Sequence, residues 1–116
     1  MIITIPDEQP ISWNKLYSGK FWAFRRDEAL RVHQLVRAYI DPEVIPPTPP
    51  VSIKITSFRK SKRRFDPDNL CAKFYIDGLV PWVIPDDDYL NVSSVTTAIK
   101  IDKHNPRLVI EVTTAS

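Results

Sequence analysis

Two groups of aspartates are the residues of this sequence most suited to chemistry. Asp66 and Asp68 flank Pro67, and a run of three further aspartates begins at Asp86. In an extended chain Asp66 and Asp68 share one face, and at the start of a helix both lie in the first turn. In either case two carboxylates lie within reach of one cation. Taken alone, however, Asp-Pro-Asp is more typical of a helix start, where Asp caps the chain and Pro takes the first position.

The second acidic group, Asp86, Asp87 and Asp88, follows a short apolar pair, Val83 and Ile84. Three adjacent carboxylates repel each other unless a cation or solvent offsets their charge. By itself such a triplet is most often a solvated turn. A single predicted helix separates it from the first acidic group, which would let the two groups meet at one edge of a sheet. Clusters made only of carboxylates suit Mg²⁺, and such sites hydrolyse phosphodiesters.

A dense basic run directly precedes the first acidic group. Residues 51–64 carry no acid, whereas residues 65–90 carry six acids and a single base, Lys73. A solvated loop or a charge balance explains such a run as well as a contact with a phosphate backbone does. Beside metal-binding acids, the run has the layout of a nuclease, and Lys73 would add positive charge for the transition state, although a lone helical lysine is more often solvated. The bases of the run are Arg59, Lys60, Lys62, Arg63 and Arg64.

An aromatic stretch near the N-terminus offers a second kind of contact. Its rings are followed by Arg25 and Arg26 and would stack on unpaired nucleobases. The commoner alternative is that most of the rings close a small hydrophobic core. Cys71 and His33 have no partner in the sequence that suggests catalysis, so we interpret both as structural or solvated. The rings are Trp13, Tyr17, Phe21, Trp22 and Phe24.

The composition excludes several other classes of protein. The 116 residues suffice for one domain, residues 1–116, and 43% of them are hydrophobic, as in ordinary globular proteins. The single cysteine excludes a disulfide framework and a cysteine-rich zinc site, and two histidines are too few for a zinc protease. Two glycines exclude a glycine-rich phosphate-binding loop. No apolar run is long enough to span a membrane, and the first residues do not resemble a signal peptide. We therefore expect no membrane association and a cytoplasmic location.

The pattern of apolar residues predicts the elements that position these groups. Period-two alternation and β-branched residues indicate four strands, at residues 2–5, 51–58, 92–101 and 107–112. Residues 103–106 are typical of a hairpin turn, and residues 6–23 are expected to form a loop. Helical spacing indicates one helix from about residue 27 to residue 40 and a second from Asp66 to about residue 79. The predicted fold class is α+β, a small mixed or antiparallel sheet in the order β-α-β-α-β-β, packed with two helices.

In combination, these residues resemble the RusA-type Holliday-junction resolvases. The resemblance lies in a basic run, an Asp-x-Asp-Asn-Leu motif, a helix with Lys and Asp-x-Leu, and an apolar piece that ends in Asp-Asp. An N-terminal Pro-x-Ser-x-Asn-x-x-Tyr stretch is also similar. Each motif is short, but their order and spacing together are fairly specific and cover essentially the whole chain. The residues concerned are Pro10, Ser12, Asn14, Tyr17, residues 66–70, Lys73, Asp77, Leu79 and residues 83–87.

The resemblance implies a Mg²⁺-dependent endonuclease that acts as a symmetric homodimer on four-way DNA junctions and nicks two opposed strands. It implies that Asp66, Asp68 and one aspartate after the helix are the essential metal-binding carboxylates. Aligning the apolar piece without a gap selects Asp87, whereas counting forward from Leu79 selects Asp88, so both stay candidates.

The resemblance also assigns roles to several polar residues. Lys73 takes the place of the family's catalytic lysine, four residues before Asp77, but it lies five residues after Asp68 where the family usually has four. Besides the basic run, Asn14 and Tyr17 are expected to contact DNA.

Two other interpretations stay open. A nuclease with the same chemistry would act on flaps, forks or other branched DNA. A non-catalytic DNA-binding module would use the same acids only as caps and turns. Cleavage that depends on a divalent ion separates the module from both nucleases, and competition between junction, fork and duplex separates the nucleases from each other.

Overall fold

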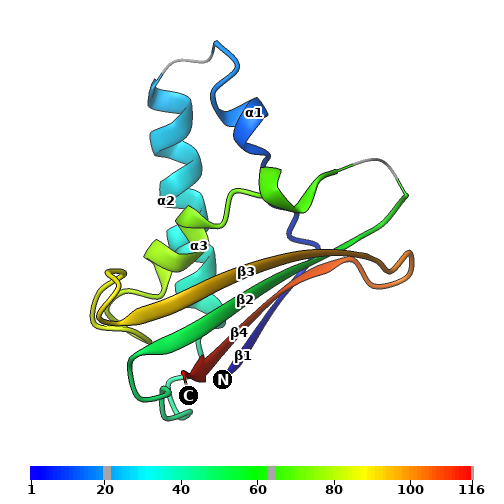
Figure 1. Cartoon of the computed structure of the whole chain (residues 1–116). Helices are drawn as coiled ribbons and strands as arrows, with labels where there is room; N and C mark the ends of the chain where they lie inside the picture. The colour runs from blue at the N-terminus through cyan, green and yellow to red at the C-terminus, as the bar shows by residue number, and fades with distance from the viewer. Residues whose placement is uncertain (20–21, 63–64, 116) are drawn as a thin grey trace.

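The strands follow from alternating side chains, and they assemble into one four-stranded sheet. The computed structural model describes residues 1–19, 22–62 and 65–115. The sheet has the order β1-β4-β2-β3, in which β4 pairs antiparallel with β1 and β2 while β3 runs parallel to β2 (Figure 1). The strands are β1 (Ile2–Pro6), β2 (Val51–Arg59), β3 (Val92–Ile101) and β4 (Arg107–Thr114). The predicted α+β class with a mixed sheet is confirmed.

The predicted hairpin between the last two strands is wrong. β3 and β4 follow each other in the chain, but β2 lies between them in the sheet. The connection passes over the end of β2, where the Asp102 N–H donates to the Arg59 carbonyl at 2.8 Å. Turn residues signal a change of direction, and they do not specify which neighbour the next strand will pair with. A two-strand step of roughly 10 Å is within reach of such a short loop.

The long helix, α2 (Trp22–Tyr39), begins five residues earlier than the sequence indicates. The predicted start, at about residue 27, lies inside the helix, where Asp27 and Glu28 pair with arginines of the same helix. The predicted loop before it contains a further one-turn helix, α1 (Trp13–Leu16). Its N-cap is Ser12, whose side chain accepts from the Lys15 N–H at 3.0 Å.

The second predicted helix is broken into two pieces. A 3-10 turn, η1 (Pro67–Asn69), follows Asp66, and the helix α3 (Lys73–Gly78) starts only at Lys73. Between them Leu70 has an extended backbone and forms an isolated bridge to Ser12. The prediction of a continuous helix from Asp66 was wrong because this pairing, between residues distant in sequence, holds the chain extended.

The helices cover one face of the sheet and leave the other face open (Figure 1). Alternate residues of β2, Val51, Ile53 and Ile55, are fully buried beneath them. The helix α3 packs closely on α2, because a Cβ added at Gly78 would lie 3.0 Å from the Cβ of Val36. Among the described residues, no helix combines the length and hydropathy that crossing a bilayer requires.

Candidate functional site

The first acidic pair lies in a polar hollow beside η1. Asp66 and Asp68 line this hollow, of about 360 Å³, together with Trp13, Asn14 and Asn69. Asp66 stands at the N-cap of η1, yet its side chain makes no capping hydrogen bond there. Capping therefore does not account for this carboxylate. Two carboxylates facing one open, polar space are a donor set that suits Mg²⁺, which keeps several of its waters.

Three contacts fix η1 and hence this hollow. The Asn14 N–H donates to Oδ1 of Asn69 at 3.2 Å, which ties η1 to α1. On the other side, Oγ1 of Thr97 in β3 donates to the Pro67 carbonyl at 2.9 Å. The Cys71 N–H donates to the Ile11 carbonyl at 3.3 Å. Two segments distant in sequence, residues 11–14 and β3, therefore hold Asp66 and Asp68 in place.

The second acidic group lies in a separate hollow of about 290 Å³ between α2, α3 and the loop before β3. The Asp87 N–H donates to Oδ1 of Asp86 at 2.7 Å, so these two neighbours form a compact acidic turn. The buried Val83 and Ile84, as expected from their apolar character, lead the chain to this turn. The lining residues are His33, Arg37, Asp77, Val80, Asp86 and Asp87.

Asp88 has a different environment from Asp87. Its side-chain Oδ1 accepts from the N–H of Asn91 at 3.1 Å and from the side-chain amide of Asn91 at 2.7 Å. Its carbonyl accepts from the Val92 N–H, where β3 begins. Asp88 is thus used in the turn that starts β3, whereas Asp87 lines the hollow.

His33, which the sequence pattern indicated to be structural or solvated, also lines this second hollow. Burial lowers the pKa of His33, while the charge of Asp77 opposes this change and Arg37 and Lys73 add to it. Its Nε2 is buried and has no hydrogen-bond partner in the part of the chain that the structure describes. The spacing of His33 and Arg37, four residues apart in α2, is the sequence signal that both face the same side.

Lys73 is the first residue of α3 and lines neither hollow. Its Nζ is 3.4 Å from Oδ2 of Asp77, one turn along α3, and its side chain is 58% exposed. Lys73 lies five residues after Asp68, where the family that the motifs resemble usually has four. No continuous helix joins the two residues, so the extra residue does not rotate Lys73 about a shared helix axis.

The two acidic hollows stay apart along the same edge strand. Thr97 of β3 bonds to η1, and Val92, the first residue of β3, bonds to Asp88. Five residues of β3, roughly 16 Å, therefore separate the points at which η1 and the second acidic group contact this strand. Within residues 1–19, 22–62 and 65–115, no group of three or more His, Cys, Asp or Glu side chains is placed to hold one metal ion. The structure thus brings Asp66 to Asp68 and Asp86 to Asp87, and it does not bring the pairs to one hollow.

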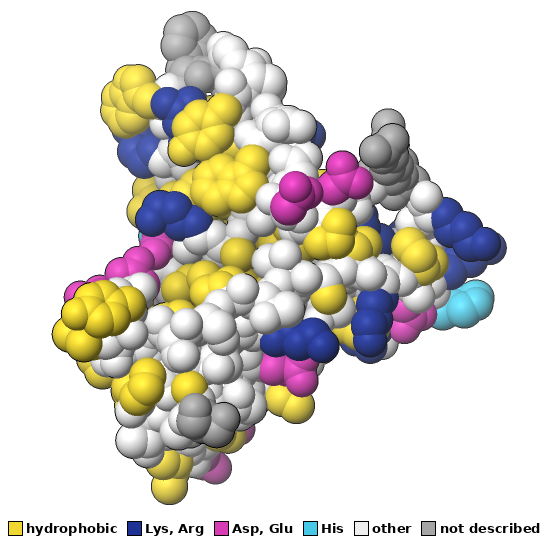
Figure 2. All heavy atoms as spheres, in the orientation of Figure 1, with side chains coloured by type: hydrophobic (Ala, Val, Ile, Leu, Met, Phe, Trp, Pro, Cys, Tyr) yellow, Lys and Arg dark blue, Asp and Glu magenta, His cyan; other side chains and the backbone are white. Residues whose placement is uncertain are grey.

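The basic run lies at the end of the sheet near η1, where Figure 2 shows basic side chains gathered. Lys60 and Lys62 are exposed, and the Arg59 guanidinium lies 4.3 Å from the ring centroid of Phe65. Arg63 and Arg64, the other two predicted phosphate contacts, lie outside the described residues.

Two cations of the neighbouring strands extend this basic end, although the sequence analysis did not select them. On the open face of the sheet, Arg107 and Lys100 flank the ring of Phe58, at 3.7 Å and 6.0 Å from its centroid. The strand register explains why these two cations lie together, because it pairs both of them with Phe58 of β2.

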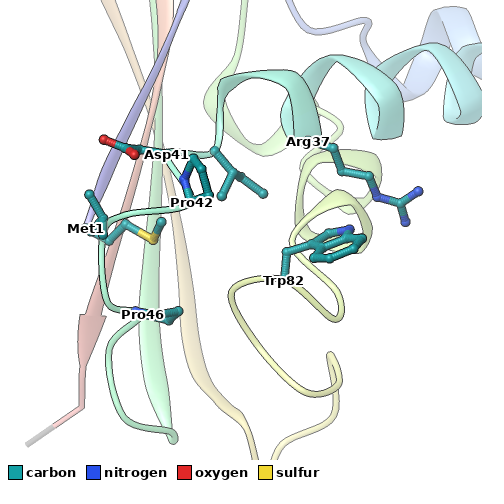
Figure 3. A pocket seen from close by; sticks show the side chains of 8 residues that line it. Met1, Arg37, Asp41, Pro42, Pro46 and Trp82 are labelled. Carbon is teal, nitrogen blue, oxygen red and sulfur yellow. The ribbon is translucent and has the colours of Figure 1, made fainter.

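An apolar hollow of about 490 Å³ lies at the C-terminal end of α2 (Figure 3). Met1, Pro42 and Pro46 border it on one side and Trp82 on the other. None of the aspartates of the two acidic groups lines it. The indole of Trp82 at its border is exposed.

No protein-family model matches the chain, and no curated protein matches it. The functional interpretation of these hollows therefore rests on their geometry and on the sequence motifs.

Proposed function

We propose that this protein is a Mg²⁺-dependent endonuclease of branched DNA that resolves four-way junctions. The observation that carries the proposal is the pair Asp66 and Asp68 in one polar hollow, directly after the basic run. Acids that hold a metal ion beside bases that hold phosphates are the arrangement that phosphodiester hydrolysis needs. The similarity of the motifs to RusA-type resolvases supports the choice of a junction as substrate.

In this proposal each group of residues has a separate task. Asp66 and Asp68 would hold Mg²⁺, which when bound would activate a water and stabilise the leaving oxygen. The basic run, with Lys100 and Arg107, holds the phosphates of the DNA arms. Lys73 places a positive charge next to the acids, and Asp87 is the third carboxylate, with Asp88 as the alternative that its turn hydrogen bonds disfavour.

The separation of Asp87 from Asp66 sets a requirement on this mechanism. Mg²⁺ binds through one or two carboxylates together with substrate phosphates, so Asp66 and Asp68 suffice for one ion. Asp86 and Asp87 then act on a second position of the DNA, or they approach when DNA draws the loop before β3 toward η1. We further propose that the protein is cytoplasmic and forms a homodimer. A two-fold dimer would place one site on each of two opposed strands.

Cleavage of a labelled synthetic four-way junction, with Mg²⁺ or with EDTA, tests the proposal. We expect paired nicks near the crossover for the unaltered protein and for Asp41→Asn, an exposed carboxylate outside both acidic hollows. We expect no nicks in EDTA or with Asp68→Asn. Comparison of Asp87→Asn with Asp88→Asn identifies the third carboxylate.

Two results would replace this proposal with its alternatives. Tight DNA binding without cleavage in any divalent ion would leave a non-catalytic binding module, and the acids would be caps and turns. Equal or better cleavage of forks and flaps in competition with the junction would keep the chemistry and change the substrate.

A further inference from the structure

An exposed set of rings and arginines covers α1 and the first turns of α2. We call it the aromatic–arginine patch, and it consists of Trp13, Tyr17, Trp22, Arg25 and Arg26. The Arg25 guanidinium lies 4.9 Å from the ring centroid of Tyr17, and that of Arg26 lies 4.8 Å from the ring of Trp22. Trp13 and Tyr17 are stacked, with centroids 5.9 Å apart and an interplanar angle of 18°. Rings and cations therefore alternate across one surface.

The outer rings of the patch are not part of the hydrophobic core. Tyr17 is 61% exposed and Trp22 is 65% exposed, whereas Leu16 of the same segment is fully buried. Trp13 and Phe24 are half-buried and do pack on the core. The expectation that most rings close the core thus applies to Trp13 and Phe24 and not to Tyr17 and Trp22; Phe21 lies outside the described residues. Large exposed rings, stacked or held under guanidinium groups, form an aromatic and cationic surface that is open to solvent.

The patch adjoins the hollow of Asp66 and Asp68. Trp13 belongs to both, because it lines that hollow and stacks on Tyr17. Figure 2 shows hydrophobic and basic side chains alternating over α1 and the N-terminal end of α2, with acidic side chains beside them. A chain bound on the patch would therefore continue directly to the two carboxylates.

We propose that the aromatic–arginine patch binds unpaired nucleobases of a single strand that leads to Asp66 and Asp68. Every nucleobase has a flat face that stacks on an aromatic ring, and the arginines between the rings attract the phosphates that join the bases. A paired duplex hides those faces, so the patch recognises unpaired nucleotides at a branch point. The role as a guide to the acids rests on the proposed nuclease function, whereas the binding of bases does not.

Charge favours nucleic acid over an apolar partner as the occupant. Lys15, Arg25 and Arg26 supply three positive charges, and Asp27 pairs with Arg26 at 3.2 Å. A purely apolar partner would have to desolvate these cations, which costs free energy unless they are paired. A phosphate backbone with exposed bases satisfies cations and rings together.

Fluorescence anisotropy in EDTA, where no cleavage occurs, measures this binding directly. The probes are a labelled oligothymidylate, an abasic strand of the same length and a blunt duplex. We expect the base-bearing strand to bind more tightly than the abasic strand, because both carry the same phosphates and only one carries bases. Tyr17→Ala and Trp22→Ala each remove one exposed ring and should weaken oligothymidylate binding by roughly 5- to 150-fold, with little effect on the abasic strand.

Matched variants separate stacking from structural damage. Tyr17→Phe and Trp22→Phe keep a ring and should retain most of the preference for the base-bearing strand. Trp82→Ala removes an indole that is 62% exposed at the other end of α2, and it should leave the preference unchanged. Circular dichroism shows whether each variant keeps the fold.

The possible outcomes distinguish this inference from the proposed function. Equal affinity for the base-bearing and abasic strands, or equal losses with Trp22→Ala and Trp82→Ala, would overturn the inference even if Mg²⁺-dependent cleavage persists. A preference that depends on Tyr17 and Trp22 in a protein that cleaves no DNA would keep the inference and overturn the nuclease.

Discussion

The ammonium group of Lys73 lies 3.4 Å from the carboxylate of Asp77, one turn along α3. Asp77 in turn lines the hollow of Asp86 and Asp87, while Lys73 follows η1 and the hollow of Asp66 and Asp68. This ion pair therefore joins the first residue of α3 to a residue that lines the second hollow. The side chain of Lys73 is 58% exposed, so Lys73 is open to a bound phosphate.

Replacement of Lys73 tests a direct role in cleavage. If Lys73 stabilises developing charge, Lys73→Gln should lower the cleavage rate by about 100-fold. The melting temperature should hardly change, because an exposed pair of this kind contributes only about 0.3–0.5 kcal/mol. Lys54→Gln, an exposed lysine on the open face of the sheet, is the matched control. Equal rates for both variants in single-turnover cleavage would remove Lys73 from the mechanism.

The hydrogen bond from Thr97 to the Pro67 carbonyl should position the first acidic pair. Thr97→Val removes it and should cost about 1 kcal/mol of unfolding free energy. We also expect slower junction cleavage, because η1 is then less firmly held against β3. Thr97→Ser keeps the hydroxyl and should restore the rate, while Thr96→Val on the opposite face of β3 should not affect it. Failure of the serine variant to restore cleavage would show that the hydroxyl does not position η1.

His33 should make the protein less stable in acid. Burial lowers its pKa below the ordinary value of 6.5, so the unfolded chain binds this proton at a pH where folded His33 stays neutral. The free energy of unfolding therefore falls as the pH drops through 6.5, and this decrease ends below the folded pKa. Urea unfolding at about pH 7.5 and pH 5 measures the effect. His33→Asn should reduce the difference between the two pH values, and His104→Asn, an exposed residue of the β3–β4 connection, should not.

Arg31 should secure the N-terminal segment to α2. It contacts the nearly buried Glu8 at 3.0 Å and Glu28 at 2.8 Å, and these carboxylates raise the pKa of Arg31 above its ordinary value. Arg31→Ala would leave the Glu8 carboxylate buried without its cation and should cost about 2 kcal/mol in chemical denaturation. The double variant Arg31→Met with Glu8→Leu should recover much of that loss. No recovery would mean that the segment depends on contacts other than this pair.

The basic run should dominate the salt dependence of DNA binding. If Arg63 and Arg64 both contact phosphates, replacing both by Ala should weaken binding and lower the slope of log affinity against log salt by about 2. Lys54→Ala should leave the slope unchanged. An unaltered slope in the double variant would remove these two arginines from the phosphate contact.

The elements whose side chains repeat with a simple period were predictable from the sequence. Alternation in residues 51–58 gave the buried face of β2, because a half-buried strand must place apolar residues at every second position. The start of α2 was missed because Asp27 and Glu28 pair with Arg26 and Arg31 inside the helix rather than capping it. Sequence position does not distinguish these two uses of an acid.

The chemistry of the site shows the same division. The amino-acid sequence by itself determined that two aspartate groups follow a basic run, and the short spacing determined that Asp66 lies with Asp68 and Asp86 with Asp87. Only the tertiary structure decided that the groups occupy different hollows, that His33 joins the second, and that β2 lies between β3 and β4. The reason is physical: local spacing limits distances only along a short stretch of chain. Contacts between distant segments, such as Thr97 with Pro67 and Ser12 with Leu70, form only when the whole core packs.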